Sequence, residues 1–456
     1  MKKFLLCTVL VFLLASCERD ASRRVVEAET PDGQPFHFMP VHENGVTDVT
    51  ITIAWPMRWA YDTGRNPAVP YIAASVIGSG GTEELKPKDV EELFNDKNSR
   101  GGLSVSSNHV IGELSFPKEH IKDIIAITNK MLVSPQFDPA WVNRIKRGFL
   151  ARQAQSQKQT ASKMWAVARR IILGDSPLNN FLSLPDLDTI ENVSVDNVRQ
   201  WHDETIIKND VTIAVVGAIS RRDAGKAIDQ LLSGLPSGQT PTTPSLQPDF
   251  SPRNILLHLP DAEKTTIGLV GPLPPTSEGG DLTDLLALNF FARPGEGSLF
   301  NAIRTDLRAS YGLEAGFTNY DRSIRFMLIT GEVETAKLAQ ASNLIRATYD
   351  AYRSNPDLTG LSDLRQVVVD GTAKNMLNIK TAARVILELA LDGRDPADAP
   401  RLAELLETIT AKDVEERLLS AFPPSNSLIM VAASPDADAL PGACIITELE
   451  QISQCP

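Results

Sequence analysis

The stretch from Ala292 to Phe317 reads ARPGEGSLFNAIRTDLRASYGLEAGF and predicts a turn, a helix and a strand in succession. Its opening segment, residues 294–297, predicts a tight turn, because proline fixes φ and glycine permits φ values that other residues avoid. Ser298 follows as a candidate N-cap of a helix that we expect to end near Tyr311-Gly312. Beyond it, residues 313–318 alternate apolar and polar side chains, which indicates a strand with one buried face.

Two side chains of the predicted helix form a candidate functional pair. Arg304 and Tyr311 lie seven residues apart, which is two helical turns, so a permanent cation and a phenol donor could point the same way. The alternative is a surface arginine in a salt bridge and a tyrosine packed at the end of the helix. The residue types alone leave both interpretations open.

The order of the expected elements repeats along the chain at a spacing of about 210 residues. The matching segments are TITIAWP and TIGLVGP (50–56 and 266–272), GGLSVSSN and YGLEAGFTN (101–108 and 311–319), and VTIAVVG and LIMVAAS (211–217 and 428–434). The repeat predicts an α+β fold of two homologous domains, each a mostly antiparallel sheet flanked by helices.

A change of composition separates the two repeats. Residues 237–253, SGQTPTTPSLQPDFSPR, are rich in Pro, Thr and Ser and lack apolar periodicity, which is typical of a linker. We therefore expect a first domain at residues 26–236 and a second at 254–456.

The duplication and the turn–helix motif together resemble the pitrilysin/insulinase-like zinc peptidases, from about Val26 to about Ala433. In that family a Gly-rich turn leads into a helix with an Arg and, seven residues on, a Tyr. The resemblance implies that Arg304 and Tyr311 contact the substrate carbonyl at a zinc site that lies in the other half. Two features depart from the family pattern: Glu296 lies between the two glycines of the turn, and Arg308 occupies a position that is usually Gly.

The zinc ligands of that family are missing from this chain. Active members carry His-x-x-Glu-His just before a Gly-Thr, and counting back from Gly81-Thr82 places Ile72, Ser75 and Val76 at the three positions. The third ligand is a Glu some seventy residues later, where Lys146 to Gln155 contain no acid. The resemblance therefore implies no metal in this chain, and zinc in a separate partner chain.

The histidines offer no substitute for that motif. No pair among the six, which are His37, His42, His109, His120, His202 and His258, combines helical ligand spacing with a nearby acid. His37 and His42 are five residues apart on a predicted strand, which would put them on opposite faces.

The first 17 residues, MKKFLLCTVLVFLLASC, resemble the signal peptide of a bacterial lipoprotein. The apolar run from Phe4 to Ala15 is too short to span a bilayer as a stable helix. The LASC ending is similar to a lipobox, which implies lipidation at Cys17 and a tether from Glu18 to Val26. An ordinary secretory signal with an accidental Cys is the alternative. Since residue 18 is not Asp, the resemblance favours the outer membrane, with the folded part in the periplasm.

Cys444 and Cys455 are the only thiols that remain after removal of such a signal. In an oxidising compartment they most simply form a disulfide, and a catalytic Cys is the weaker alternative. The formal net charge of −12 argues against nucleic acid or an anionic membrane surface as a partner, so any membrane contact is expected through the lipid alone.

These observations predict the non-catalytic subunit of a heterodimeric zinc peptidase. A homologous partner would carry the zinc motif and hydrolyse peptide substrates, and this chain would supply Arg304 and Tyr311. The alternative is a structural or binding protein of the same fold that takes no part in proteolysis.

Overall fold

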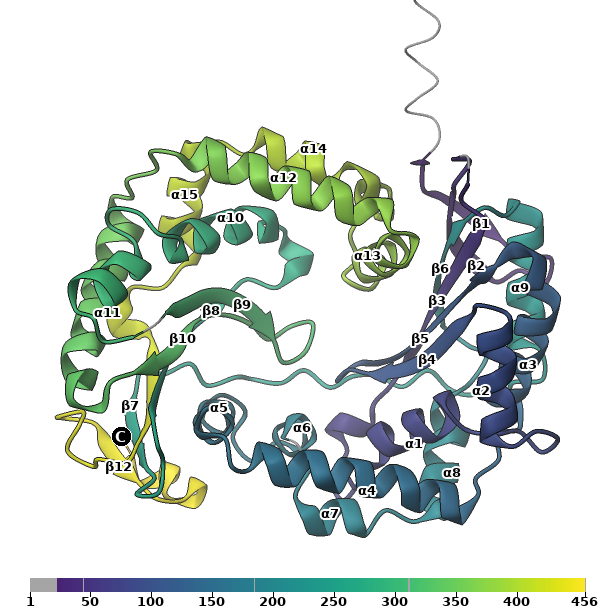
Figure 1. The fold of residues 1–456 in the computed structure, drawn as a ribbon, viewed down its shortest axis with the longest axis horizontal. Helices are drawn as coiled ribbons and strands as arrows, with labels where there is room; N and C mark the ends of the chain where they lie inside the picture. Colours follow the sequence, from purple (N-terminus) through teal and green to yellow (C-terminus); the bar gives the residue numbers. More distant parts are fainter. Residues whose placement is uncertain (1–22, 44, 184, 311, 456) are drawn as a thin grey trace, which may run out of the picture.

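The computed structural model describes residues 23–43, 45–183, 185–310 and 312–455. The predicted signal peptide with Cys17 and the candidate residue Tyr311 lie outside the described residues. Two six-stranded sheets, each accompanied by helices, lie on opposite sides of the molecule (Figure 1). No helix in the described part of the chain is long and apolar enough to cross a membrane.

The first sheet has the strand order β1-β2-β6-β3-β5-β4. Its strands are β1 (Val26–Glu29), β2 (Pro35–Pro40), β3 (Asp48–Pro56), β4 (Arg100–Val105), β5 (His109–Pro117) and β6 (Thr212–Gly217). The helices of this half are α1 (Val69–Gly78), α2 (Pro87–Asp96), α3 (Ile121–Val133), α4 (Pro139–Ser156), α5 (Thr160–Leu173), α6 (Pro177–Leu182), α7 (Leu187–Glu191), α8 (Val195–Thr205) and α9 (Arg221–Leu232).

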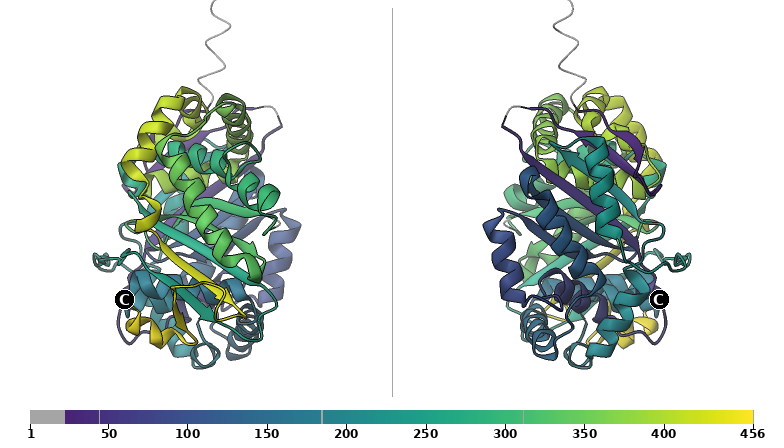
Figure 2. Two further views of the ribbon diagram at one scale, coloured as in Figure 1. Left: turned by 90° about the vertical axis from the view of Figure 1, so that its left-hand side faces the viewer. Right: turned by 90° about the vertical axis from the view of Figure 1, so that its right-hand side faces the viewer.

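The second sheet has the order β12-β7-β11-β8-β10-β9. Its strands are β7 (Asn254–His258), β8 (Thr265–Leu273), β9 (Leu313–Asn319), β10 (Arg325–Val333), β11 (Ile429–Ser434) and β12 (Cys444–Ile446). The helices are α10 (Asp281–Ala292), a π-helical turn (Asn301–Asp306), α11 (Leu338–Ser354), α12 (Leu361–Leu377), α13 (Ile379–Leu391), α14 (Leu402–Thr408) and α15 (Ala411–Ala421). The side views show helices on the outer face of each half (Figure 2).

The predicted fold class is confirmed. Strands β2, β3, β4, β5 and β6 recur as β7, β8, β9, β10 and β11 in the same spatial order. Among these five strands of each sheet, one pair is parallel and three pairs are antiparallel. Only the added edge strands differ, because β1 runs antiparallel to β2 whereas β12 runs parallel to β7.

The sequence predicts a tether from Glu18 to Val26, but the end of this segment is not a free tether in the structure. Val25 is buried at 6% exposure, and Val26 already belongs to β1. Arg23 forms an ion pair with Glu43 at 2.6 Å. The part of the predicted tether that the structure describes is therefore packed on the first sheet.

Each half of the chain donates one helix to the sheet of the other half. Helix α13, from the second half, packs on β3 and β6 of the first sheet, where Thr52 Oγ1 donates a hydrogen bond to the Ala383 carbonyl at 3.3 Å. Helix α5, from the first half, packs on β8 and β11 of the second sheet. A Cβ added at Gly268 would lie only 2.8 Å from Met164 Sδ of α5, so the glycine permits the close approach. The two halves therefore share cores rather than merely touch.

Polar contacts at the turn between β9 and β10 also join the halves. Tyr61 of the first half donates to Asp321 Oδ2 at 3.1 Å. Ser107 of the first half donates its hydroxyl hydrogen to the Tyr320 carbonyl at 2.8 Å. Within the second half, Arg322 of this turn pairs with Glu388 at 2.6 Å and with Asp392 at 2.5 Å. Burial, with a smaller contribution from Arg322, lowers the pKa of the neighbouring His109 to about 4, so its imidazole is neutral at pH 7.

The segment 237–253, predicted as a linker, contains neither helix nor strand. It crosses between the two halves (Figure 1), and Asp249 N donates to the Ile172 carbonyl at 2.9 Å on the way.

Cys444 and Cys455 form a disulfide with a Cα–Cα distance of 5.7 Å and a sequence separation of 11. The bond ties β12 to the C-terminal segment. Cys444→Ser is expected to lower the free energy of unfolding by about 2–3 kcal/mol, because the unfolded chain loses the constraint of a loop of this length. Urea unfolding followed by circular dichroism measures the change. Chemical reduction of the unaltered protein is the control and should produce a similar loss; a loss below about 0.5 kcal/mol in both would contradict the loop argument.

Candidate metallopeptidase-like site

Helix α1 carries the three positions that correspond to the zinc motif. Ile72 and Val76 are fully buried in the apolar core at 0% exposure. The Ser75 hydroxyl donates to the Tyr71 carbonyl one turn earlier, at 2.8 Å. Two aliphatic side chains and a hydroxyl that serves its own helix do not fit a zinc ion.

The segment expected to hold the third ligand, residues 146–155, lies in the C-terminal half of α4. Gln153 is the buried side chain in it, at 7% exposure, and a neutral amide stands there instead of a carboxylate. Across the residues that the structure describes, no group of three or more His, Cys, Asp or Glu side chains could hold a metal ion. The described residues therefore provide no ligand set for the zinc ion that the resembled family binds.

The two neighbouring histidines are not arranged as predicted. Strand β2 ends at Pro40, so His42 lies beyond the strand rather than on its opposite face. His37 does lie on β2, and burial lowers its pKa. Neither histidine belongs to a metal-binding group.

The turn and the start of the helix in the 292–317 stretch follow the sequence prediction. Helix α10 ends at Ala292. Ser298 accepts a hydrogen bond from Asn301 N at 3.2 Å through its hydroxyl, and its carbonyl accepts one from Ala302 N at 3.1 Å. Ser298 is therefore the cap that the sequence indicated.

The end of that helix was predicted wrongly. The helical hydrogen bonds widen to the π type, as Leu307 N donates to the Ala302 carbonyl, and the helix ends at Asp306 instead of near residue 311. The physical reason lies at Arg308, which has φ +50° and so adopts a left-handed conformation that cannot continue a right-handed helix. The argument that two helical turns align Arg304 with Tyr311 therefore fails.

Arg304 itself is on the surface of this short helix. Its side chain is exposed, and its guanidinium carbon lies 4.9 Å from the centre of the Phe300 ring. No carboxylate within the described ranges forms an ion pair with it. The alternative considered from the sequence, a surface salt bridge of Arg304, is therefore not formed within the described residues.

The left-handed residue coincides with the position where the resembled family usually has Gly. An L-residue pays roughly 1 kcal/mol for this conformation, and glycine does not. Arg308→Gly is therefore expected to raise the free energy of unfolding by about 0.5–1 kcal/mol, measured by urea titration. Arg308→Ala is the control, because it removes the charge and keeps the strain. A Gly variant no more stable than the Ala variant would contradict the explanation.

A feature that sequence reasoning missed lies beside the turn. A pocket of about 130 Å³ is lined by Phe290, Arg293, Ser298 and Tyr352. Arg293 covers the Phe290 ring at 3.7 Å, and the Tyr352 hydroxyl donates to the Ala287 carbonyl at 2.8 Å. Burial raises the pKa of Tyr352, so the phenol stays protonated. No motif in the sequence marks this pocket, because its walls come from segments sixty residues apart.

Fold and site together define a metallopeptidase-like protein without the zinc ligands. Residues 192–362 match the family described as the Peptidase M16 inactive domain. The predicted resemblance to the non-catalytic members of the pitrilysin/insulinase-like peptidases is thereby confirmed, and the match includes the stretch that carries Arg304. A search of curated proteins found no match.

Solved structures show the same fold at low sequence identity. The peptidase M16 inactive domain from Pseudomonas fluorescens is 17% identical with a TM-score of 0.78, and the match covers 90% of this chain and 98% of that one. A protease from Helicobacter pylori is 10% identical with a TM-score of 0.75, covering 91% and 100%. The periplasmic protease PqqL from Escherichia coli is 13% identical with a TM-score of 0.70, covering 94% of this chain and 50% of PqqL.

Proposed function

We propose that this chain is the non-catalytic subunit of a heterodimeric zinc peptidase and that it presents Arg304 and Tyr311 to peptides held in the partner's zinc site. The proposal rests on the contrast between the zinc-motif positions on α1 and the position of Arg304. The zinc positions on α1 are filled by buried aliphatic side chains, whereas Arg304 remains an exposed cation without a carboxylate partner in the described ranges.

An arginine in this state suits a role in trans. Because no acid in the described part of the chain pairs with it, its guanidinium is available to donate to a substrate carbonyl on which negative charge develops. The Phe300 ring, 4.9 Å from the guanidinium carbon, interacts with the cation without taking up its N–H donors. The water-activating chemistry belongs to the zinc of the partner chain, so the two contributions do not need to share a polypeptide.

We place the assembly in the periplasm, anchored to the outer membrane through a lipid on Cys17. The signal-like N-terminus supports this location, and so does the disulfide, since such bonds persist in oxidising compartments. Incorporation of labelled palmitate that is lost in Cys17→Ser would support the anchor, and an unlabelled protein would refute it.

Isolation of the protein from its own cells tests the proposed function. The affinity-purified chain is expected to bring with it a homologous protein that contains His-x-x-Glu-His. The pair should contain one zinc ion and cleave unfolded peptides, whereas each chain alone should cleave far more slowly. One tightly bound zinc per purified lone chain would contradict the proposal. A pair whose cleavage does not depend on this chain would favour the structural or binding role.

A further inference from the structure

The first described residues of the chain are held against the end of helix α12. Arg23 Nη1 donates a hydrogen bond to the Met376 carbonyl at 2.6 Å, and the same guanidinium pairs with Glu43. Val25, Val41 and Met376 belong to one cluster of buried apolar side chains. Figures 1 and 2 show β1, α12 and α13 at the same end of the molecule. These contacts fix the point at which the preceding segment meets the folded part of the chain.

Only a short length of chain separates this point from Cys17, the proposed site of lipidation. An extended chain advances at most about 3.6 Å per residue, so the segment from Cys17 to Arg23 can span roughly 20 Å. Helix α12 alone is longer, since its 17 residues extend about 25 Å. A lipid on Cys17 therefore keeps the end of the molecule that carries Arg23 close to the bilayer.

This end of the molecule has an excess of positive charge. We define the N-terminal patch as residues 23–25, 41–43 and 370–380. Besides His42 it contains four cations and two carboxylates, namely Arg23, Arg24, Lys374 and Lys380, and Glu43 and Asp370. No carboxylate within the described ranges forms an ion pair with Arg24, Lys374 or Lys380. Because the whole chain has a formal charge of −12, an anionic surface repels the molecule overall and attracts this patch.

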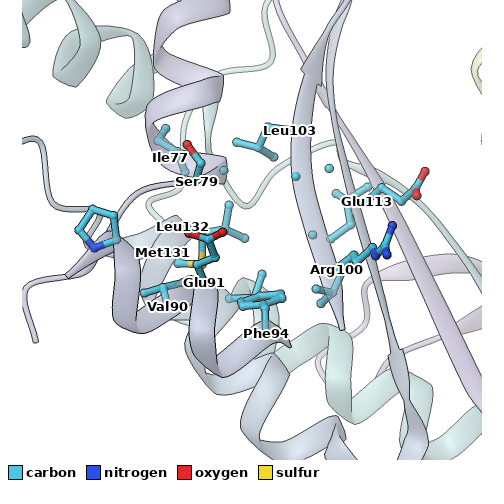
Figure 3. A pocket seen from close by; sticks show the side chains of 18 of the residues that line it. Ile77, Ser79, Val90, Glu91, Phe94, Arg100, Leu103, Glu113, Met131 and Leu132 are labelled. Atoms are coloured by element: carbon cyan, nitrogen blue, oxygen red, sulfur yellow. The ribbon is translucent and has the colours of Figure 1, made fainter. Parts of the chain in front are cut away.

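Exposed apolar side chains accompany these cations. Among the described residues four large hydrophobic side chains are strongly exposed, and two of them lie on α12, Val367 at 68% and Leu377 at 59%. Leu377 belongs to the patch and follows Lys374 by about one helical turn. Basic residues around an exposed apolar side chain are typical of surfaces that contact the headgroup region of a bilayer. None of these residues lines the apolar pocket of about 540 Å³ between the first sheet and α2, α3 and α4, which Figure 3 shows.

We propose that the N-terminal patch docks on the phospholipid bilayer that holds the lipid on Cys17, an inference that rests on the proposed lipid anchor. Leu377 enters the headgroup region of the bilayer. The side chains of Arg24, Lys374 and Lys380 lie against the phosphates of anionic phospholipids. The membrane contact then extends beyond the lipid alone, and the end of the molecule formed by α12 and α13 faces the bilayer.

Fluorescence quenching at single labelled positions tests the proposal. The acylated protein is purified from cells and reconstituted into vesicles of phosphatidylethanolamine and phosphatidylglycerol that include a headgroup-spin-labelled phospholipid. A nitrobenzoxadiazole dye on Leu377→Cys is expected to be quenched at least about twofold, because the dye reaches the headgroups. Cys444 and Cys455 are paired and do not take up the dye.

Gln155→Cys is the matched control for the dye. It is an exposed position on α4, the helix at the opposite end of the molecule in Figure 1, and its label should not be quenched. Equal quenching of the two labels would overturn the proposal.

Charge reversal tests the role of the cations. The double variant Lys374→Glu, Lys380→Glu is expected to lower the ratio of docked to undocked protein at least about tenfold, because each cation near an anionic bilayer contributes to the attraction. Replacement of phosphatidylglycerol by phosphatidylcholine should reduce the quenching in the same way. The double variant Lys88→Glu, Lys122→Glu, at exposed positions on α2 and α3, is the control and should dock as the parent does. Undiminished quenching in the patch variant would overturn the assignment to this surface.

Flotation with the vesicles separates failure of docking from failure of the anchor. Protein that floats but shows equal quenching of both labels would overturn the docking surface and leave the anchor in place. Protein that does not float would refute the lipid on Cys17. A histidine tag placed before Glu18 and bound to a nickel-chelating lipid then holds the chain at the same point, and the comparison of the two labels is repeated. Circular dichroism confirms that each variant is folded.

Discussion

Arg304→Ala is expected to lower the turnover of the proposed zinc peptidase pair by about 10²- to 10³-fold without preventing assembly. The guanidinium is exposed and forms no ion pair within the described residues, so we expect its loss to disturb the fold little beyond the contact with the Phe300 ring. Peptide cleavage by the reconstituted pair measures the effect, and gel filtration confirms that the pair forms.

Combination with Tyr311→Phe tests whether the two groups act on one oxygen. If both donate to the same developing charge, the double variant should lose less than the product of the two single losses. Arg308→Ala, four residues from Arg304, is the control for loss of positive charge and should be milder. Full activity in both single variants would show that this chain acts as a scaffold.

Asp284→Asn is expected to lower the free energy of unfolding by about 3–5 kcal/mol. Asp284 is fully buried between two guanidiniums, with Arg325 Nη1 at 2.7 Å and Arg417 Nε also at 2.7 Å. The hydrogen bond with Asp284 is the largest cause that raises the pKa of Arg417. The neutral amide would leave Arg325, itself 3% exposed, as a buried cation without a counter-ion.

Chemical denaturation measures this loss, and Asp281→Asn provides a matched control. Asp281 lies in the same helix and pairs with Arg394 at 2.7 Å, but both side chains are partly exposed. Solvent screens such a pair, so we expect a loss of about 1 kcal/mol or less. A loss below about 1 kcal/mol in Asp284→Asn would show that the buried charges are compensated elsewhere.

The buried cluster also bears on the candidate site. Asp284 belongs to α10, which ends at Ala292, where the 292–317 stretch with the candidate residue Arg304 begins. Arg325 opens β10 and covers the Phe317 ring of β9 at 4.2 Å. The cluster therefore fixes the elements before and after Arg304, so Asp284→Asn should also impair the position of that residue.

The sequence predicted the repeated strands because their signal is local. Apart from Asp48, residues 48–56 and 265–273 are apolar or β-branched, and each segment forms a central strand of its sheet. Strand β1 was missed because VEAE is short and half of it is acidic, so pairing with β2 rather than intrinsic preference makes it a strand.

The candidate site was predictable only in part, for a different physical reason. Ser298 could be recognised as a cap from residue types alone, but the left-handed conformation of Arg308 could not, since arginine rarely adopts it. The pocket beside the turn is lined by residues 290–298 and 351–357, and no sequence period reports that these two segments meet. Amphipathic periodicity likewise shows that α13 has an apolar face without showing which sheet it covers.

The exchange of α5 and α13 between the halves limits how this protein could have arisen. One half without its neighbour would leave the inner face of its sheet bare, including the buried Val216 and Ala54 that α13 now covers. A single ancestral copy would have had the same uncovered sheet face. Two identical copies that exchanged this helix would each have covered the sheet of the other. Fusion of the genes for such a homodimer would give the present chain directly, and afterwards each half could diverge on its own.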